Sequence, residues 1–181
     1  MPIVTAMTAS LAPARAAPPK PPSLVREQPQ DARLVAGLIE RAFGPGRYAK
    51  AAERLREHNQ PLLDISFTAW SDQRLVGCVR MWPVHIGEAP AVFLGPFAVE
   101  AEFRSLGLGA ALIRRACAAA AEAGHGLVLL VGDRPYFEPL GFRPVPPKRI
   151  ALPGPVDPAR VLTLALKPGA DEDLAGPVRA G

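Results

Sequence analysis

The pattern of apolar residues near the start of the chain predicts a helix. Apolar residues recur three or four positions apart, at Leu34, Val35, Leu38, Ile39, Ala42 and Phe43. This spacing gathers them on one face of a helix, which Gln30 or Asp31 can cap and Gly44 can end. A short strand is expected before it at residues 24–26, and a weaker helical pattern follows at residues 48–58.

Between residues 65 and 99 the apolar period changes from that of a helix to that of strands. Ile65, Phe67 and Ala69 alternate with other residues, and side chains along a strand point alternately to its two faces. The predicted strands cover residues 65–70, 75–82 and 91–99, and the turns between them cover residues 71–74 and 87–90. Because the connections are short, we expect an antiparallel meander.

The second half of the chain alternates helical and strand patterns. Residues 106–123 are rich in alanine and leucine and predict a long central helix with an apolar stripe. The uninterrupted apolar run at residues 127–131 is typical of a strand covered on both faces. Asp133 can cap a short helix that Gly141 ends, and residues 161–166 are the last strand expected.

The length of 181 residues suits one domain with a hydrophobic core of its own, which we expect at residues 23–167. Residues 1–22 are rich in proline and alanine and lack the basic start of a signal peptide, so they are expected to form a disordered tail. Residues 168–181 are expected to form a flexible C-terminal tail. An interaction function for the N-terminal tail rests on composition alone.

Composition and charge argue against several classes of protein. The net charge is +4, from 21 basic and 17 acidic residues, without the basic runs of a nucleic-acid-binding surface. No stretch of about 18 consecutive apolar residues predicts a membrane span. Cys78 and Cys117 lie in apolar segments, which favours reduced buried thiols and a cytoplasmic location. His58, His85 and His125 do not share a metal-ligand spacing, so no metal site is predicted.

The candidate chemistry lies at the turn between the strand at residues 91–99 and the central helix. This turn reads Arg104-Ser105-Leu106-Gly107-Leu108-Gly109. The start of a helix presents backbone N–H groups without partners and the positive end of the helix dipole, so it can bind phosphate. A Walker A loop would need Gly-Lys-Ser/Thr, but Ala110 follows the last glycine. A dinucleotide-binding fingerprint would need a third glycine where Leu112 stands.

The pattern that remains, Arg-x-x-Gly-x-Gly, resembles the motif of the GCN5-related N-acetyltransferases, which is Gln/Arg-x-x-Gly-x-Gly/Ala between a strand and a helix. Residues 94–99 (Leu-Gly-Pro-Phe-Ala-Val) and 136–142 (Tyr-Phe-Glu-Pro-Leu-Gly-Phe) are also similar to this family, and the wording looks closest to its YhbS-like members. The resemblance covers residues 24–166. It implies an α/β fold whose mixed, mostly antiparallel central sheet has about six or seven strands, a splayed central pair and helices on both faces.

The resemblance also implies that acetyl-CoA, or another short acyl-CoA, is the co-substrate. Backbone amides at the start of the helix would hold its pyrophosphate, and the main chain of the preceding strand would pair with its pantetheine arm. The residues implied in this binding are Phe97, Ala98, Val99, Arg104, Ser105, Leu106, Gly107, Leu108, Gly109 and Ala110. Leu106 departs from the family, which often carries a basic residue at this place.

By the same resemblance, a primary amine attacks the thioester directly, and a backbone N–H around residues 94–97 stabilises the oxyanion. The family's frequent acid, a tyrosine, corresponds to Phe137 here. Tyr136 is the candidate acid, although one residue along a helix is a rotation of about 100°. No general base is evident. The alternative function is a non-catalytic domain that binds or senses acyl-CoA.

The acceptor is expected to be an amine of a small molecule or peptide, with no nucleic acid or membrane partner. The resemblance places it between the first two helices and the sheet. The candidate residues for its binding are Phe43, Tyr48, Arg80 and His85. Either a monomer or a homodimer is compatible with the sequence.

Overall fold

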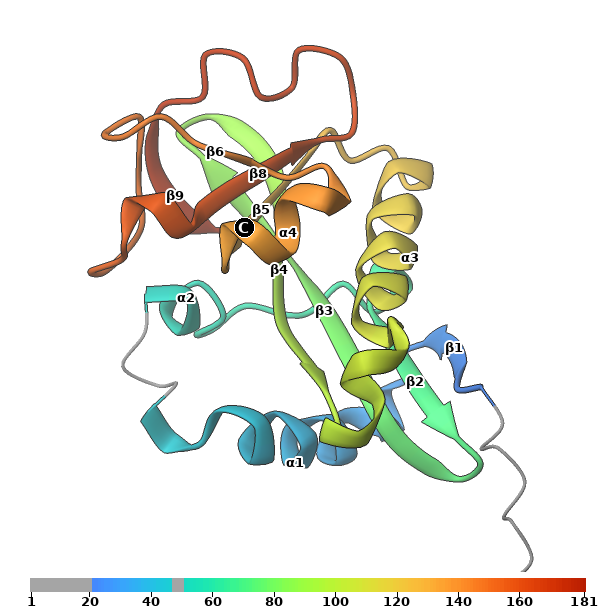
Figure 1. The fold of residues 1–181 in the computed structure, drawn as a ribbon. Helices are drawn as coiled ribbons and strands as arrows, with labels where there is room; N and C mark the ends of the chain where they lie inside the picture. The colour runs from blue at the N-terminus through green and yellow to red at the C-terminus, as the bar shows by residue number, and fades with distance from the viewer. Residues whose placement is uncertain (1–20, 47–50) are drawn as a thin grey trace, which may run out of the picture.

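The structure, a computed structural model, describes residues 21–46 and 51–181 (Figure 1). The expected N-terminal tail therefore lies, except for Pro21 and Pro22, outside the described residues, and it stays a prediction. The α-helices are α1 (Ala32–Phe43), α2 (Ala51–Arg54), α3 (Leu108–Glu122) and α4 (Arg134–Phe137). The strands are β1 (Ser23–Arg26), β2 (Phe67–Ser71), β3 (Arg74–Ile86), β4 (Ala89–Val99), β5 (Leu127–Val131), β6 (Arg143–Pro144), β7 (Ile150–Ala151), β8 (Val161–Ala165) and β9 (Gly176–Ala180).

The strands form one mixed, mostly antiparallel sheet. Its order is β1-β2-β3-β4-β5-β8-β6, and β9 pairs with β3 and with β7. Along this order the pairing of β4 with β5 is parallel, and the other pairings are antiparallel. The predicted meander β2-β3-β4 and the α/β fold class are confirmed. In the described part of the chain the sheet has nine strands, more than expected.

The prediction of a flexible C-terminal tail is wrong for the last residues of the chain. Residues 176–180 form β9, which lies antiparallel to β3, with Ile86 opposite Val178. Val178 is buried and supplies an apolar anchor for this strand. This strand is difficult to recognise in the sequence because proline and glycine lie close to Val178. β3 runs to Ile86, beyond the predicted end at residue 82, and its last residues pair with both β4 and β9.

The first predicted strand of the meander begins later than its alternation indicated. Residues Leu63–Ile65 form a 3-10 helix, and β2 starts at Phe67. Ser66 between them is buried, where its hydroxyl donates to Leu62 O (2.8 Å) and accepts from Met81 N–H (3.0 Å). This polar residue is therefore a satisfied core group, and it does not mark a solvent-facing side of the strand.

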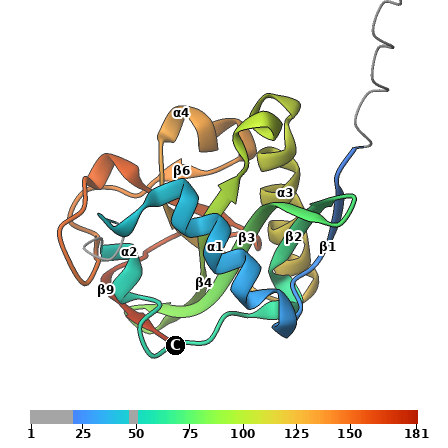
Figure 2. The same ribbon diagram turned by 90° about the horizontal axis from the view of Figure 1, so that it is seen from below.

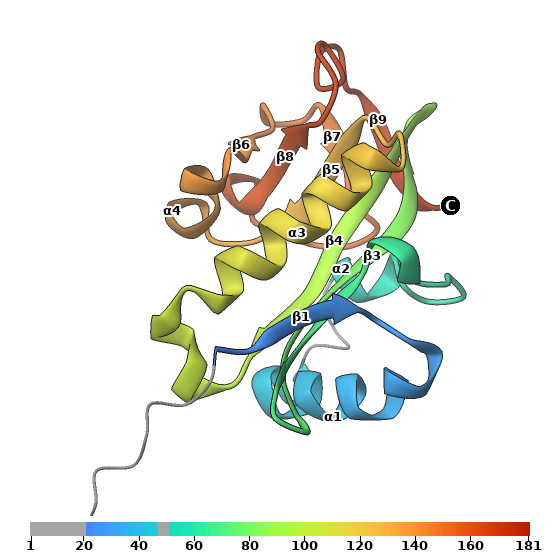
Figure 3. The same cartoon turned by 90° about the vertical axis from the view of Figure 1, so that its right-hand side faces the viewer.

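Helices cover both faces of the sheet. Leu112, Ile113 and Ala116 of α3 share a core cluster with Val76 and Val79 of β3. On the opposite face, Val35, Leu38 and Ile39 of α1 pack with Leu75, Cys78 and Ala98. Figure 2 shows α1 crossing β3 and β4, and Figure 3 shows α3 running along the sheet. Successive residues of a strand face opposite sides of the sheet. Because helices cover both sides, both sets of side chains are buried, and this accounts for the nearly continuous apolar strands.

The two central strands diverge partway along their length. β4 and β5 are in register only at Val92–Val128 and Phe93–Leu129. Beyond Phe93, β4 continues to Val99 with β3 on one side and without β5 on the other. The edge of β4 is therefore open to another extended chain. This confirms the splayed pair that was expected.

A bulge bends β4 where the two strands diverge. Met81 lies opposite Leu94 and Val79 opposite Phe97, so Arg80 of β3 faces two residues of β4, Gly95 and Pro96. The indole N–H of Trp82 donates to Gly95 O (2.6 Å) and holds the bulge from β3. Bulges re-aim backbone groups, and this one lies at the predicted oxyanion position.

Candidate functional site

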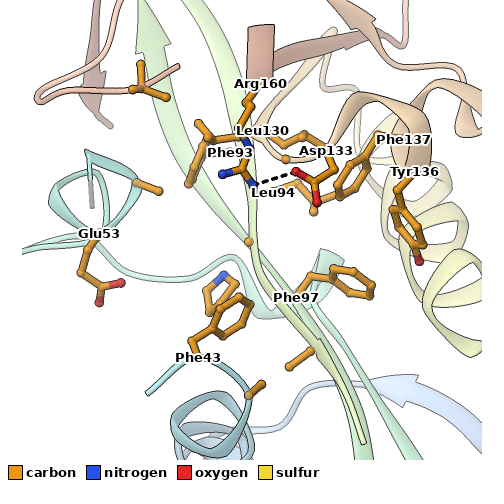
Figure 4. A pocket seen from close by; sticks show the side chains of 18 of the residues that line it. Phe43, Glu53, Phe93, Leu94, Phe97, Leu130, Asp133, Tyr136, Phe137 and Arg160 are labelled. Carbon is orange, nitrogen blue, oxygen red and sulfur yellow. Dashed lines mark ion pairs between the residues drawn. The ribbon is translucent and has the colours of Figure 1, made fainter. Parts of the chain in front are cut away.

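A cleft of about 670 Å³ opens where β4 and β5 diverge (Figure 4). Its floor is the β4 segment at residues 93–99, and one side is formed by Gly109 of α3 together with Tyr136 and Phe137 of α4. The end of β5 at residues 130–133 closes a second side. The remaining walls come from the end of α1, from α2 and from the loop before β8. One elongated ligand can therefore touch both the open edge of β4 and the start of α3.

The start of α3 has the geometry predicted for a phosphate-binding turn. Gly107 adopts a left-handed conformation (φ 73°) as the N-cap of α3. Ala111 N–H donates to Gly107 O (3.1 Å), which is the first hydrogen bond of the helix. The amides of Leu108, Gly109 and Ala110 precede that bond and are therefore the orphan donors of the helix N-terminus.

The helix begins later than the predicted residue 106, because Ala101–Leu106 form a 3-10 helix instead. This places side chains of the turn in different surroundings. Leu106 is 61% exposed and Leu108 is buried in the core below α3. Five of the ten predicted cofactor-binding residues, Ser105, Leu106, Gly107, Leu108 and Ala110, are not among the cleft-lining residues.

The other predicted cofactor-binding residues line the cleft. These are Phe97, Ala98, Val99, Arg104 and Gly109. The Nε–H of Arg104 donates to Val99 O (3.0 Å), so its guanidinium lies at the end of the open β4 edge. The sequence motif and the strand are thus joined by a direct contact, and a positive charge is held where phosphate binding was predicted.

Gly109 is the glycine of the motif that the surrounding packing requires. A Cβ at this position would lie 2.5 Å from Tyr136 Oη and 2.9 Å from Phe97 Cζ. Real Cβ atoms do not approach other atoms so closely, and both neighbours belong to aromatic side chains that pack on each other. Any larger residue at 109 would therefore displace the aromatic wall of the cleft.

That wall is built from three aromatic rings. Tyr136 stacks on Phe97 with 5.9 Å between centroids, and Phe137 meets the edge of Tyr136 at 5.0 Å. Phe137 is buried, and its ring fills the space where a Cβ on Gly132 would lie. Tyr136 is 43% exposed. The two neighbours both line the cleft but differ in burial, because Phe137 also belongs to the core and Tyr136 lies at the surface.

The hydroxyl of Tyr136 remains protonated at neutral pH. Burial raises the pKa of this phenol above its usual 10, while the positive charge of Arg114 acts in the opposite direction. In Figure 4 the hydroxyl points away from Leu94 and Asp133. It is a hydrogen-bond donor beside Gly109, at the phosphate-binding turn.

Two ion pairs line the other end of the cleft. Arg56 Nη1 lies 2.7 Å from Glu53 Oε2, and the guanidinium of Arg56 stands over the ring of Phe93, 5.5 Å from its centroid. Arg160 Nη2 lies 3.1 Å from Asp133 Oδ1. No sequence motif marks these charged residues as part of a site. Only the position of Asp133 could have indicated one, because it follows the carboxyl end of the buried strand β5.

The residues predicted to bind the acceptor are not brought together. Phe43 lines the cleft, whereas Tyr48 lies outside the described residues. Arg80 does not line the cleft, and it forms an ion pair with Glu27, whose side chain is 1% exposed. His85 is exposed on β3 between Pro90 and Arg179, also away from the cleft lining. Arg80 thus supports the strand opposite the bulge instead of contacting a substrate there.

Residues 21–46 and 51–181 contain no group of three or more His, Cys, Asp or Glu side chains that could hold a metal ion. None of the described helices combines the length and apolar composition needed to span a bilayer.

Comparison with known proteins adds a family match. The model of the family described as "Acetyltransferase (GNAT) family" matches residues 32–142, a segment that includes β4, the phosphate-binding turn, α3 and α4. Among curated proteins, none matches the chain.

Several solved structures have a similar fold. The GNAT family N-acetyltransferase YhbS from Escherichia coli, in complex with CoA, has a TM-score of 0.77 at 24% identity, with 92% of this chain and 93% of that chain covered. A GNAT family acetyltransferase from Brucella melitensis, in complex with acetyl-CoA, has a TM-score of 0.63 at 28% identity, with 81% and 89% covered. Naa50 from Arabidopsis thaliana, in complex with the bisubstrate analogue CoA-Ac-MVNAL, has a TM-score of 0.56 at 15% identity, with 80% and 98% covered.

Proposed function

The chain belongs to the acetyltransferase (GNAT) family, and we propose that it transfers acetyl, or another short acyl group, from acyl-CoA to a primary amine of a small molecule or peptide. The observation that carries this proposal is the continuity of the cleft. The open edge of β4 leads directly to the orphan amides at the start of α3. An extended arm with a pyrophosphate at its end matches both features at once.

We assign the cofactor to the end of the cleft bounded by Phe97, Gly109 and Tyr136. The main chain of residues 97–99 would pair with the pantetheine arm, and the amides of residues 108–110 would hold the pyrophosphate. The complexes of the E. coli and B. melitensis proteins with CoA and acetyl-CoA support this assignment. The guanidinium of Arg104 adds a positive charge near the phosphates.

In the proposed reaction, the acceptor ammonium first loses a proton to solvent. The neutral nitrogen attacks the thioester carbon, the C–N bond forms and the C–S bond breaks. The nitrogen then loses its extra proton to solvent, and CoA leaves as a thiolate that takes up a proton from solvent. Pro96 has no N–H, so the donors available around the bulge to stabilise the oxyanion are the amides of Leu94, Gly95 and Phe97. A thiol pKa near 8.5 lets the thiolate depart with little protonation.

The acid role of Tyr136 stays a prediction. The position of its hydroxyl beside Gly109 supports a second role, donation to the phosphate end of the cofactor. The two roles have different kinetic consequences, because loss of an acid lowers kcat whereas loss of a cofactor contact raises KM for acetyl-CoA.

The first experiment measures thermal unfolding with and without acetyl-CoA. A ligand at one hundred times its Kd stabilises the native state by about 2.7 kcal/mol, so a clear rise in Tm is expected. Release of free CoA thiol with a panel of amines then tests catalysis. A rise in Tm without thiol release from any amine would favour the alternative function, an acyl-CoA sensor, and no rise in Tm would exclude both functions.

A further inference from the structure

The ion pair between Asp133 and Arg160 is the feature of the cleft that the cofactor does not explain. Asp133 is the N-cap residue of α4, but its carboxylate accepts no capping hydrogen bond. Pro135 has no N–H to offer, and Tyr136 N–H donates to the main-chain oxygen of Asp133 (3.0 Å). The carboxylate turns into the cleft instead, toward Arg160 (Figure 4).

The main chain brings Asp133 and Arg160 next to each other independently of the attraction between their charges. Val131 lies opposite Val161 in the pairing of β5 with β8, and Gly132 N–H donates to Arg160 O (2.9 Å). The side chains of Asp133 and Arg160 are 77% and 48% exposed. Exposed ion pairs contribute little to stability, so this pair is not needed to hold the fold together. Both groups are accessible to a ligand in the cleft.

The opposite wall of the cleft has a different character. There the Glu53–Arg56 pair is mostly buried, with side chains 16% and 13% exposed, and Arg56 stands over Phe93. Phe43, Ala52 and Val156 add apolar surface to the lining. An occupant of this end therefore meets apolar side chains on one side and an accessible, adjacent anion and cation on the other.

From this arrangement, and resting on the proposed function, we infer that the acceptor is a free α-amino acid with an apolar side chain. Its ammonium and carboxylate are adjacent, as are Asp133 and Arg160, so the two pairs can align with opposite charges facing each other. Arg160 would bind the carboxylate as a planar, charge-assisted donor, and Asp133 would hold the amine. The side chain would lie against Phe43 and Val156. A simple amine would leave Arg160 without a ligand partner.

The test compares acceptors that differ only in the carboxylate: phenylalanine with phenethylamine, and leucine with 3-methylbutylamine. Initial rates of CoA thiol release are measured at saturating acetyl-CoA. We expect kcat/KM to be about 10- to 100-fold higher for the amino acid of each pair, as expected for a hydrogen bond to a charged group. Arg160→Ala should reduce this ratio to near one. Arg134→Ala, which removes an exposed arginine paired with Glu138 outside the cleft lining, should leave the ratio unchanged.

Binding provides a second readout that does not depend on turnover. Calorimetric titration of phenylalanine and of phenethylamine into the CoA-saturated protein should show the same preference and the same loss in Arg160→Ala. Turnover or binding without a carboxylate preference, or a preference that survives Arg160→Ala, overturns the inference while the proposed function stands. Arg160-dependent binding of phenylalanine without thiol release supports the inference and contradicts the proposed function.

Discussion

The two ends of the cleft are built from different parts of the polypeptide. The proposed cofactor end uses main-chain groups of β4 and of the start of α3, which are separated by one short 3-10 helix. The proposed acceptor end uses side chains of α1, α2, the end of β5 and the loop before β8. These segments are distant in sequence and meet only in the folded sheet. One end is therefore a local motif, and the other is a product of tertiary structure.

This difference explains which changes each end tolerates. Main-chain donors are present whatever the side chain, so the cofactor end depends on steric room, above all at Gly109. The acceptor end depends on the identity of a few charged side chains, such as Asp133 and Arg160, that the backbone positions. The fold can keep its cofactor end while substitutions at the acceptor end change which acceptor binds.

The largest expected effect concerns Arg80, which the sequence assigned to the acceptor end. The structure instead pairs it with the buried Glu27. Glu27→Gln leaves the Arg80 guanidinium without its counter-charge, and the free energy of unfolding should fall by about 3 kcal/mol. Urea unfolding measures this loss. Glu138→Gln breaks an exposed pair and serves as the control, with no measurable change expected. If Glu27→Gln keeps full stability but loses turnover, Arg80 belongs to the acceptor end after all.

Gly109→Val should remove cofactor binding by displacing the aromatic wall of the cleft. The new side chain enters the space of Tyr136 Oη and the Phe97 ring. The stabilisation by acetyl-CoA, about 2.7 kcal/mol at one hundred times Kd, should disappear from thermal unfolding curves. Gly46→Val is the matched control, because a Cβ there has no atom within 4 Å. A Tm rise retained in Gly109→Val would mean that the cofactor binds elsewhere.

The titration of the two cysteines reports on the packing of the core clusters beneath α3 and α1. Cys117 lies in the core cluster under α3 and Cys78 in the one under α1. Burial raises the pKa of each thiol from 9.0 to about 12. Between these values the unfolded chain releases protons that the folded chain retains, so stability should fall as pH rises, by at most about 1.4 kcal/mol per pH unit for each thiol. Urea midpoints from pH 8 to 11 measure this slope. A slope unchanged in Cys78→Ala would contradict a buried, protonated Cys78.

Tyr136→Phe should have the smallest effect. If the hydroxyl contacts the cofactor, KM for acetyl-CoA should rise about three- to tenfold with kcat unchanged, since a hydrogen bond from a partly exposed hydroxyl contributes about 0.5–1.5 kcal/mol. Because its pKa is raised, the phenol should act as a donor throughout the neutral range, and wild-type KM should stay flat to about pH 10. A fall in kcat of one hundredfold or more at unchanged KM would instead assign Tyr136 as the acid.

The contrast between the ends also explains how much the sequence could predict. The helix spacing, the meander and the Arg-x-x-Gly-x-Gly turn are local patterns, and each was recognisable without a structure. β9 was missed because a strand of five residues with proline and glycine has almost no local signal. Arg80 was misjudged because its partner Glu27 is distant in sequence. Arg160 was not identified because its place in the cleft follows from the pairing of β5 with β8.

In the proposed binding mode, acyl-CoA lies along the open edge of β4 and at the start of α3. Amide hydrogen exchange, with and without CoA, reads the backbone groups of both segments. We predict slower exchange with CoA at residues 97–99 and 108–110, and little change in β9 and β1. Protection confined to other segments, or no protection at saturating CoA, would exclude this binding mode.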